Sequence, residues 1–185
     1  MKVKIRRSNQ ADLEQVYQLQ LKSFPPNDQW YRSNIKQYLD SGVIIACRES
    51  GTLIGVLLQG PIIPCNQKYN IDGLNTDYKE DIFEPLNDLG HFFLDESMHF
   101  KELYGIVMIC VDPDFRGRGL GKKLIEKHWL DNPNKTVCLH TRRSNINAYS
   151  LYKSMGYEHI ALIKNKYFLP CEDSIFMVKN LTKKN

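Results

Sequence analysis

Apolar and polar positions along the chain follow two spacings, one typical of strands and one typical of helices. Short apolar or alternating runs predict strands over residues 3–7, 43–47, 53–58, 106–111, 136–140, 157–162 and 174–178. Apolar positions three and four residues apart predict helices that begin near Asn9, Trp30, Leu120 and Asn145. Two of the strands, joined by residues 49–52, have the pattern of a hairpin. This mixture predicts an α+β domain.

Residues 61–100 do not follow either spacing. They form a connection rich in proline, asparagine and glycine, far longer than the few residues that usually join two elements. Only the acidic stretch 77–86 favours a short helix. A connection of this length in a compact domain is usually functional or mobile, and the sequence leaves that choice open. We therefore expect one domain over residues 1–185 with a long insert at about 61–100.

Composition and charge narrow the class of protein. A chain of 185 residues with 42% hydrophobic and 25% charged residues is typical of one globular domain. Its net charge of +4 falls short of the basic character of nucleic-acid binders. Five cysteines without a Cys-x-x-Cys pair favour buried thiols over disulfides or a metal site. No segment resembles a signal peptide or a membrane span, so we expect a cytoplasmic protein with no metal, no nucleic acid and no membrane partner. The oligomeric state is left open.

The most informative stretch runs from Val111 to Ile125. An apolar strand ends at Pro113, the glycine-rich turn RGRGLG occupies residues 116–121, and helical spacing starts at Leu120. Backbone N–H groups converge where a helix begins, and the helix dipole favours an anion there. Cations outnumber carboxylates in the segment, which holds Arg116, Arg118, Lys122 and Lys123 against Asp112 and Asp114. This pattern indicates a binding site for a pyrophosphate.

Spacing separates three kinds of phosphate-binding turn. A P-loop has four residues between its glycines and ends in Gly-Lys-Ser/Thr, whereas only three residues separate Gly117 from Gly121 and Lys123 replaces the hydroxyl. A dinucleotide fingerprint needs G-x-G-x-x-G and a later acidic residue, and residues 140–142 are His-Thr-Arg. A plain glycine-rich turn that starts a helix is the remaining alternative to the third pattern, Val-x-Pro-x-x-Arg-Gly-x-Gly-x-Gly.

That third pattern resembles the pyrophosphate motif of the GNAT superfamily of N-acetyltransferases. Residues 139–157, LHTRRSNINAYSLYKSMGY, resemble the second conserved block of the same superfamily. Lys166-Tyr167-Phe168 with Glu172-Asp173 is similar to one branch, the bacterial ribosomal-protein alanine acetyltransferases and the eukaryotic N-terminal acetyltransferases. The specific resemblance runs from Tyr104 to Leu181, and the long insert departs from it. It implies the GNAT fold, a mixed, mostly antiparallel sheet of about seven strands with about four helices.

The resemblance also implies the roles of individual residues. It implies acetyl-CoA as cofactor, with coenzyme A as product, bound by Ile109, Val111, Arg116, Gly117, Arg118, Gly119, Leu120, Gly121, Lys122 and Asn145. The implied catalytic residues are His140, Tyr152 and Tyr104. The residues implied to line the site for an incoming peptide are Phe24, Pro25, Tyr31 and Tyr167. From the residues alone, His140 is equally a structural histidine, Tyr152 a core aromatic and Asn145 a helix cap.

The expected reaction is transfer of an acetyl group to a primary amine. An α-amino group has a pKa of about 7.7–8.0, so about a tenth to a fifth of it is neutral at pH 7, against less than one part in a thousand of lysine. A histidine with a pKa near 6.5 would be an adequate base, directly or through a water. A tyrosine hydroxyl would give a proton to the leaving thiolate, and N–H groups near Ile109 to Val111 would stabilise the oxyanion.

Two other functions stay open on the sequence. An enzyme that acetylates a small-molecule amine, such as a polyamine or arylalkylamine, would use acidic or aromatic residues of the 61–100 insert. A non-catalytic acyl-CoA-binding module would keep the glycine-rich turn but would not need both His140 and Tyr152. We expect a protein or peptide N-terminus as the substrate.

Overall fold

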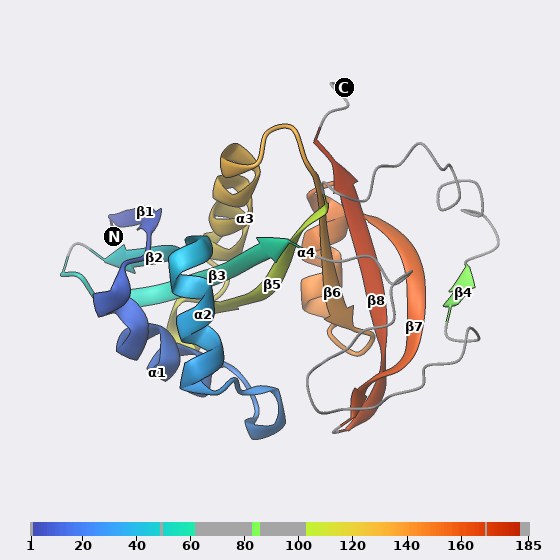
Figure 1. Cartoon of the computed structure of the whole chain (residues 1–185), viewed down its shortest axis with the longest axis horizontal. Coiled ribbons are helices and arrows are strands. Elements are labelled where there is room, and N and C mark those ends of the chain that lie inside the picture. The colour runs from blue at the N-terminus through green and yellow to red at the C-terminus, as the bar shows by residue number, and fades with distance from the viewer. Residues whose placement is uncertain (1, 49, 62–82, 86–102, 169, 182–185) are drawn as a thin grey trace. The chain divides into compact units, whose positions relative to one another are not determined.

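The computed structural model describes residues 2–48, 50–61, 83–85, 103–168 and 170–181 (Figure 1). Nearly all of the 61–100 insert lies outside these residues. Its described part includes β4 (Phe83–Pro85), a short strand, within the stretch for which the acidic composition had favoured a helix. The short helix is therefore wrong at these three residues.

The chain divides into two compact units, each built from two separate segments. The first unit comprises Met1–Gly60 and Tyr104–Asn134, and the second comprises Pro61–Leu103 and Lys135–Asn185. Each unit has its own strands, helices and apolar interior, and each carries part of the predicted site.

The first unit is a sheet of antiparallel pairs with three α-helices. In chain order its elements are β1 (Val3–Arg7), α1 (Leu13–Ser23), α2 (Arg32–Gly42), β2 (Ile44–Arg48), β3 (Leu53–Pro61), β5 (Leu103–Val111) and α3 (Leu120–Asp131). Strand β2 pairs antiparallel with β1 on one side and with β3 on the other, and β5 is the next strand after β3. Short 3-10 turns lie at Gln10–Asp12, Pro26–Asp28 and Pro113–Phe115.

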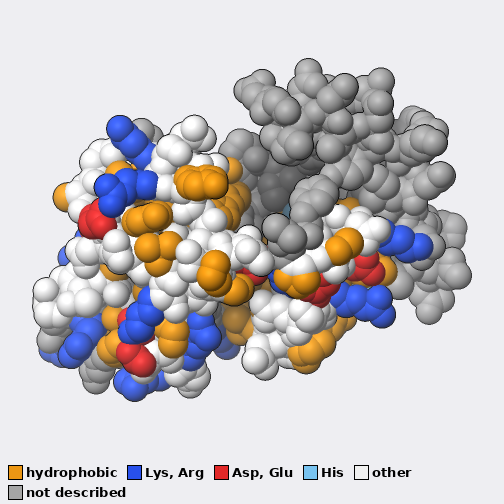
Figure 2. All heavy atoms as spheres, turned by 90° about the horizontal axis from the view of Figure 1, so that it is seen from below, with side chains coloured by type: hydrophobic (Ala, Val, Ile, Leu, Met, Phe, Trp, Pro, Cys, Tyr) orange, Lys and Arg blue, Asp and Glu red, His pale blue; other side chains and the backbone are white. Residues whose placement is uncertain are grey.

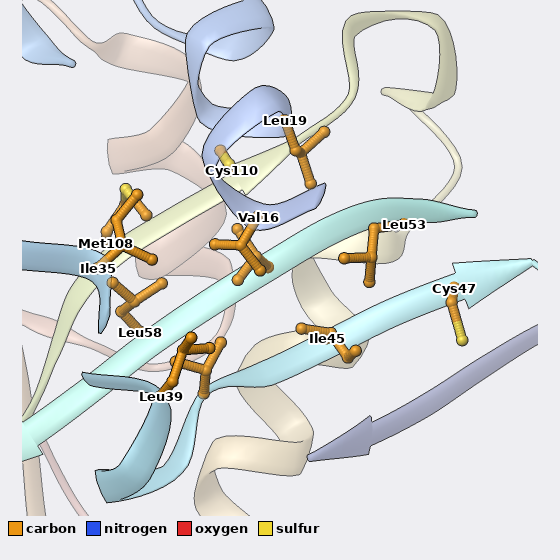
Figure 3. Close-up of a cluster of buried hydrophobic side chains, with 12 residues drawn as sticks. Val16, Leu19, Ile35, Leu39, Ile45, Cys47, Leu53, Leu58, Met108 and Cys110 are labelled. Carbon is orange, nitrogen blue, oxygen red and sulfur yellow. The ribbon is translucent and has the colours of Figure 1, made fainter. Parts of the chain in front are cut away.

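The interior of the first unit forms between the helices and the sheet. Val16 and Ile35, from α1 and α2, are fully buried and point toward side chains from the strands, among them Leu58 and Met108 (Figure 3). Asp12 lies at the start of α1 and accepts two hydrogen bonds from Arg6, at 2.7 and 2.8 Å. The Arg6 guanidinium lowers the pKa of this carboxyl, so a charged pair ties β1 to the helix that follows it.

The second unit is an antiparallel sheet with one α-helix. Its elements are β4, β6 (Thr136–Arg142), α4 (Ile146–Ser154), β7 (Glu158–Phe168) and β8 (Cys171–Asn180). Strand β8 lies between β6 and β7 and pairs antiparallel with both, and β4 pairs antiparallel with β7. Gly156, at φ 81°, ends the α4 turn as expected.

Besides β4, the predicted elements differ most from the structure at the last hairpin. Residues 165–170 were expected to be a loop, but β7 continues to Phe168 and β8 begins at Cys171. The pairing is irregular between Ile163 and Tyr167, where Asn165 takes a left-handed φ of 52°. Residues 164–166 are polar and their pairing is irregular, yet they stay within the β7–β8 pair. The hydrogen bonds between the strands hold them there, and the spacing of apolar residues does not predict those bonds.

The α+β class is confirmed. Within the described residues there are four α-helices and eight strands, one more strand than the pattern predicted because of β4. None of the helices in these ranges combines the length and the apolar character that crossing a membrane requires.

Candidate functional site

The glycine-rich turn of the first unit starts α3 in an unusual way. Asp112 follows β5 and caps the 3-10 turn by accepting a hydrogen bond from the Asp114 N–H at 3.0 Å. Gly117 and Gly119 then take left-handed φ values of 72° and 73°. Gly119 is the N-cap of α3 and offers no side-chain acceptor, so no side chain caps the first N–H groups of this helix.

This start of α3 is suited to binding an anion. Helix caps normally carry an oxygen that satisfies the first N–H groups, and an uncapped, glycine-led start leaves those groups for a ligand. A Cβ placed on Gly117 or Gly119 would meet nothing within 4 Å, so the positive φ rather than lack of space selects glycine at both positions. Leu120 and Gly121, in the first turn of α3, carry N–H groups of this kind, and the buried Leu120 side chain anchors the turn.

The cations of the turn are largely engaged with the chain itself. Arg116 donates to the Val111 carbonyl at 3.2 Å and to the Ser23 carbonyl at 3.1 Å. Arg118 donates to the Asp114 carbonyl at 3.2 Å and lies over the Phe115 ring. The two arginines therefore brace the turn, which leaves the backbone N–H groups as its principal donors. The exposed Lys122 lies 3.9 Å from the Glu126 carboxylate.

Three further candidates lie on β5. Ile109 and Val111, at the end that leads into the turn, are partly buried. Tyr104 is near the other end of the strand, seven residues before Val111, which at about 3.3 Å per residue is more than 20 Å away. Its ring stacks on the buried His128 ring, with centroids 6.0 Å apart, and burial raises its pKa. Within the first unit, Tyr104 and the turn are not brought together.

The segment between α1 and α2 carries the other candidates of the first unit. Phe24 packs against the apolar interior, Pro25 is exposed at the start of a 3-10 turn, and Tyr31 is 79% exposed before α2. The buried amide of Gln20 holds this segment, since it exchanges two hydrogen bonds with the Trp30 backbone at 3.0 and 3.2 Å. Sequence analysis missed Gln20, because a glutamine in an amphipathic helix has no distinguishing spacing.

His140 lies on β6 in the second unit, opposite Phe176 of β8. The two rings are 4.8 Å apart, and Nδ1 of His140 is 3.3 Å from the Ser174 hydroxyl. Burial, with a smaller contribution from the Lys166 ammonium, lowers the pKa of His140 to about 3. The expectation of an ordinary imidazole with a pKa near 6.5 is therefore wrong, because both effects disfavour the charged ring.

Tyr152 and Asn145 belong to α4. Tyr152 is 4% exposed and meets the Tyr157 ring edge-on at 5.9 Å. Burial, followed by the neighbouring Tyr167, raises the pKa of the Tyr152 hydroxyl above its ordinary value, so this group keeps its proton at neutral pH. Asn145 caps the helix through its side-chain oxygen, which accepts from the Ala148 N–H at 3.2 Å. The cap leaves the amide nitrogen of Asn145 as a donor.

Tyr167 is held by a charged network at the last hairpin. The Arg142 guanidinium lies 4.1 Å from the centre of the Tyr167 ring and donates to Glu172 at 3.3 Å. Glu172 also accepts from the Ser144 N–H, and in β7 and β8 it stands directly opposite Tyr167. Burial alone would raise the pKa of Glu172, but Ser144 and Arg142 together hold it below its ordinary value. Sequence analysis predicted a loop here and so missed the contacts that hold Tyr167, because only the strand register brings Tyr167 and Glu172 together.

The predicted residues thus fall into two groups. The first unit contains the turn, Ile109, Val111, Tyr104 and the α1–α2 segment, and the second contains His140, Tyr152, Asn145 and Tyr167. Among the described residues, no group of three or more histidine, cysteine, aspartate or glutamate side chains is arranged to hold a metal ion.

We predict that His140 does not titrate between pH 5 and 8. Its ring proton resonances should stay at the neutral position as the pH falls through 6.5, where an unfolded histidine takes up a proton. The folded state holds the ring neutral, so the contribution of His140 to the free energy of unfolding should be complete above pH 6.5. It should decline as the pH falls toward 3, because the unfolded chain binds the proton first. Lys166→Met should raise the pKa of His140 only partly, because burial is the larger cause. NMR titration of both proteins is the measurement, and a wild-type midpoint near 6.5 would contradict the prediction.

Comparison with known proteins finds sequence matches for the middle of the chain. The acetyltransferase (GNAT) domain family matches residues 88–159. The [ribosomal protein bS18]-alanine N-acetyltransferases of Salmonella typhimurium and Escherichia coli K12 are 41% and 40% identical over 78 residues, which are 40% of this chain and 47% of each relative. The chain therefore matches about half the length of these curated relatives.

Solved structures extend the likeness to the whole fold. The ribosomal-protein-S18-alanine N-acetyltransferase from Escherichia coli has a TM-score of 0.69 at 18% identity, covering 100% of this chain and 97% of that one. Arabidopsis thaliana NAA60 in complex with acetyl-CoA has a TM-score of 0.72 at 18% identity, covering 97% and 99%. These structures share the fold that the sequence predicted, so the GNAT fold is confirmed, and residues 88–159 match the acetyltransferase (GNAT) domain family.

Proposed function

We propose that this protein is an acetyl-CoA-dependent N-acetyltransferase that acts on the α-amino group of a protein or peptide N-terminus. The observation that carries the proposal is the uncapped start of α3, with left-handed glycines at 117 and 119, inside the region that matches the GNAT family. The names of the similar enzymes, which are N-acetyltransferases of ribosomal protein alanine, support the choice of acceptor.

Acetyl-CoA would supply an acetyl group already activated as a thioester. The backbone N–H groups of residues 117–122 would bind its pyrophosphate, with Lys122 as a further donor. Arg116 and Arg118 would keep the turn in shape through their bonds to backbone carbonyls. Asn145 would add its amide nitrogen, since the helix cap uses only its oxygen. N–H groups of Ile109 and Val111 are the donors that we propose for the developing oxyanion.

The pKa of His140 decides how the amine is handled. An imidazole with a pKa of about 3 lies roughly five units below an α-ammonium, so it cannot take a proton from that ion to any useful extent. It remains a good hydrogen-bond acceptor, and it would orient an amine that arrives neutral, or a water beside it. An α-amine suits this site because about a tenth to a fifth of it is already neutral at pH 7. A lysine amine suits it less, because far less of it is neutral at that pH.

Tyr152 provides the complementary group. Its hydroxyl keeps its proton throughout the physiological range, because burial raises its pKa. A thiol has an ordinary pKa of about 8.5, well below that of this phenol, so Tyr152 would donate a hydrogen bond to a thiolate more readily than a whole proton. The proton that the amine nitrogen loses as the amide forms would pass to this thiolate, directly or through a water, so that coenzyme A leaves as the thiol. Tyr104 stays a weaker candidate, since it stacks on His128 at the far end of β5 from the turn.

In the first unit, Phe24, Pro25 and Tyr31 are the residues that we propose as contacts of the acceptor peptide, and in the second unit Tyr167 is a separate candidate. The network of Arg142 and Glu172 fixes the Tyr167 ring, which suits a contact that must be made in one geometry. The free, buried thiols of Cys47, Cys110 and Cys138 fit the cytoplasm, where thiols stay reduced. A small-molecule amine remains the second candidate on sequence grounds, with less support from the similar enzymes.

We predict that Gly119 is needed for its backbone conformation. Gly119→Val should weaken acetyl-CoA binding by at least about tenfold, because a β-branched residue strongly disfavours a φ of 73°. Gly119→Asn is the matched variant, since asparagine tolerates this conformation, and it should lose less affinity. Isothermal titration calorimetry with CoA measures both. Unchanged affinity in Gly119→Val would remove the turn from the binding site.

We predict that His140 and Tyr152 act after binding, as hydrogen-bonding partners of the amine and of the leaving thiolate. His140→Ala and Tyr152→Phe should each lower kcat by roughly 10²- to 10⁴-fold while CoA affinity is kept. The rising limb of the pH profile of kcat/KM should follow the pKa of the peptide amine and stay in place in His140→Ala, because His140 does not titrate there. A limb near pH 6.5 that disappears in this variant would show that His140 is an ordinary base after all.

The acceptor class can be tested directly with three substrate sets. Acetyl-CoA is offered with peptides free at the N-terminus, with the same peptides blocked there but bearing lysine, and with a panel of small amines. We expect turnover of the free peptides, with lysine peptides slower by at least about two orders of magnitude, as their smaller neutral fraction requires. Mass spectrometry locates the acetyl group. Turnover confined to the small amines would refute the peptide proposal and leave the acetyltransferase in place.

A further inference from the structure

One cation beside the glycine-rich turn comes from a distant part of the chain. Lys22, near the end of α1, places its ammonium nitrogen 2.8 Å from Asp112 Oδ1 and 2.7 Å from Asp114 Oδ2. The hydrogen bonds that Lys22 donates to Asp112 and then to Asp114 raise the pKa of Lys22, so it stays charged. The next residue, Ser23, accepts a hydrogen bond from Arg116. The end of α1 and the turn are thus joined at three points, all within the first unit.

The negative charges of Asp112 and Asp114 would repel an anion bound at the glycine-rich turn. Asp112 cannot simply be absent, because its side chain caps the 3-10 turn that leads into RGRGLG. Asp112 and Asp114 therefore set two negative charges within a few residues of the N–H groups meant for a pyrophosphate. Burial alone would raise the pKa of Asp112, but Lys22, the Asp114 N–H and Arg116 together hold it below the ordinary value. Asp112 is thus ionised when a ligand arrives.

We propose that Lys22 is a positioning residue of the acetyl-CoA site, which neutralises Asp112 and Asp114 so that the turn can accept a pyrophosphate. The inference rests on the proposed function and adds to it a residue outside the GNAT motif. Lys22 acts through the aspartates and not on the ligand, since its ammonium group is engaged by both carboxylates at hydrogen-bond distance. Figure 2 shows Lys and Arg side chains gathered on one face of the molecule, with Asp and Glu side chains beside some of them.

Two rival roles for Lys22 predict different results. If Lys22 bound the phosphates itself, removing the two carboxylates would not replace it. If it only braced the fold, its loss would lower thermal stability, yet exposed ion pairs of this kind contribute little to stability. If Lys22 acts by neutralising the two aspartates, then replacing both aspartates should restore the CoA affinity that is lost when Lys22 is replaced. Neither rival role predicts this result.

The test is a charge-balance series measured by calorimetry with CoA. Lys22→Met should weaken CoA binding by about five- to thirtyfold at low salt, and this deficit should shrink as salt screens the aspartates. Lys22→Met combined with Asp112→Asn and Asp114→Asn should return to within about threefold of wild type, because asparagine can still cap the turn. Lys36→Met, which removes an exposed lysine of α2, is the control for net charge and should bind as wild type does.

Each outcome bears on the proposal. CoA affinity that is unchanged in Lys22→Met, or a triple variant as weak as Lys22→Met, overturns it while the proposed function stands. Failure of the wild-type protein to bind CoA overturns both. Melting temperatures of all variants are compared, and recovery of binding without recovery of stability supports neutralisation. Lys22→Arg, which keeps the charge, should retain most of the affinity.

Discussion

Helix α3 begins without a side chain to satisfy its first N–H groups, and much of the proposed site follows from this one constraint. Unsatisfied donors at a helix start are costly unless water or a ligand accepts from them. Gly119 leaves those donors open, and the left-handed turn before it can be formed cheaply only by glycine. The neighbouring arginines bond to backbone carbonyls, so they preserve the shape of the turn. Backbone N–H groups are therefore the main donors in the proposed site, and a list of its side chains would not reveal them.

Carboxylates serve as fixed points in both units. Asp12 joins β1 to α1 through Arg6, and Glu172 joins β6 to β8 through Arg142 and the Ser144 N–H. Each carboxylate is paired with a cation and a backbone donor, the combination that makes partial burial of a charge tolerable. Asp112 follows the same rule with Lys22 and the Asp114 N–H. The difference is location, because of these three carboxylates Asp112 is the one beside the turn that we propose as the pyrophosphate site.

Burial sets the proton chemistry of the second unit. It lowers the pKa of His140 and raises that of Tyr152, so each group is held in its neutral form across the physiological range. A site of two neutral hydrogen-bonding groups favours a substrate that supplies its own neutral amine. In the proposed mechanism, this match between a weak base and an α-amino group favours an N-terminal acceptor.

The sequence by itself determined the elements, the fold class and the glycine-rich turn, because each depends on local spacing or on the φ preference of glycine. The start of α3 after Gly119 and the Asn145 cap could be predicted within a residue for that reason. The tertiary structure alone decided which charges meet. Lys22 lies 90 residues before Asp112, and Tyr167 faces Glu172 only through strand register. It also decided the pKa of His140, since desolvation depends on what packs around a ring and no local pattern records it.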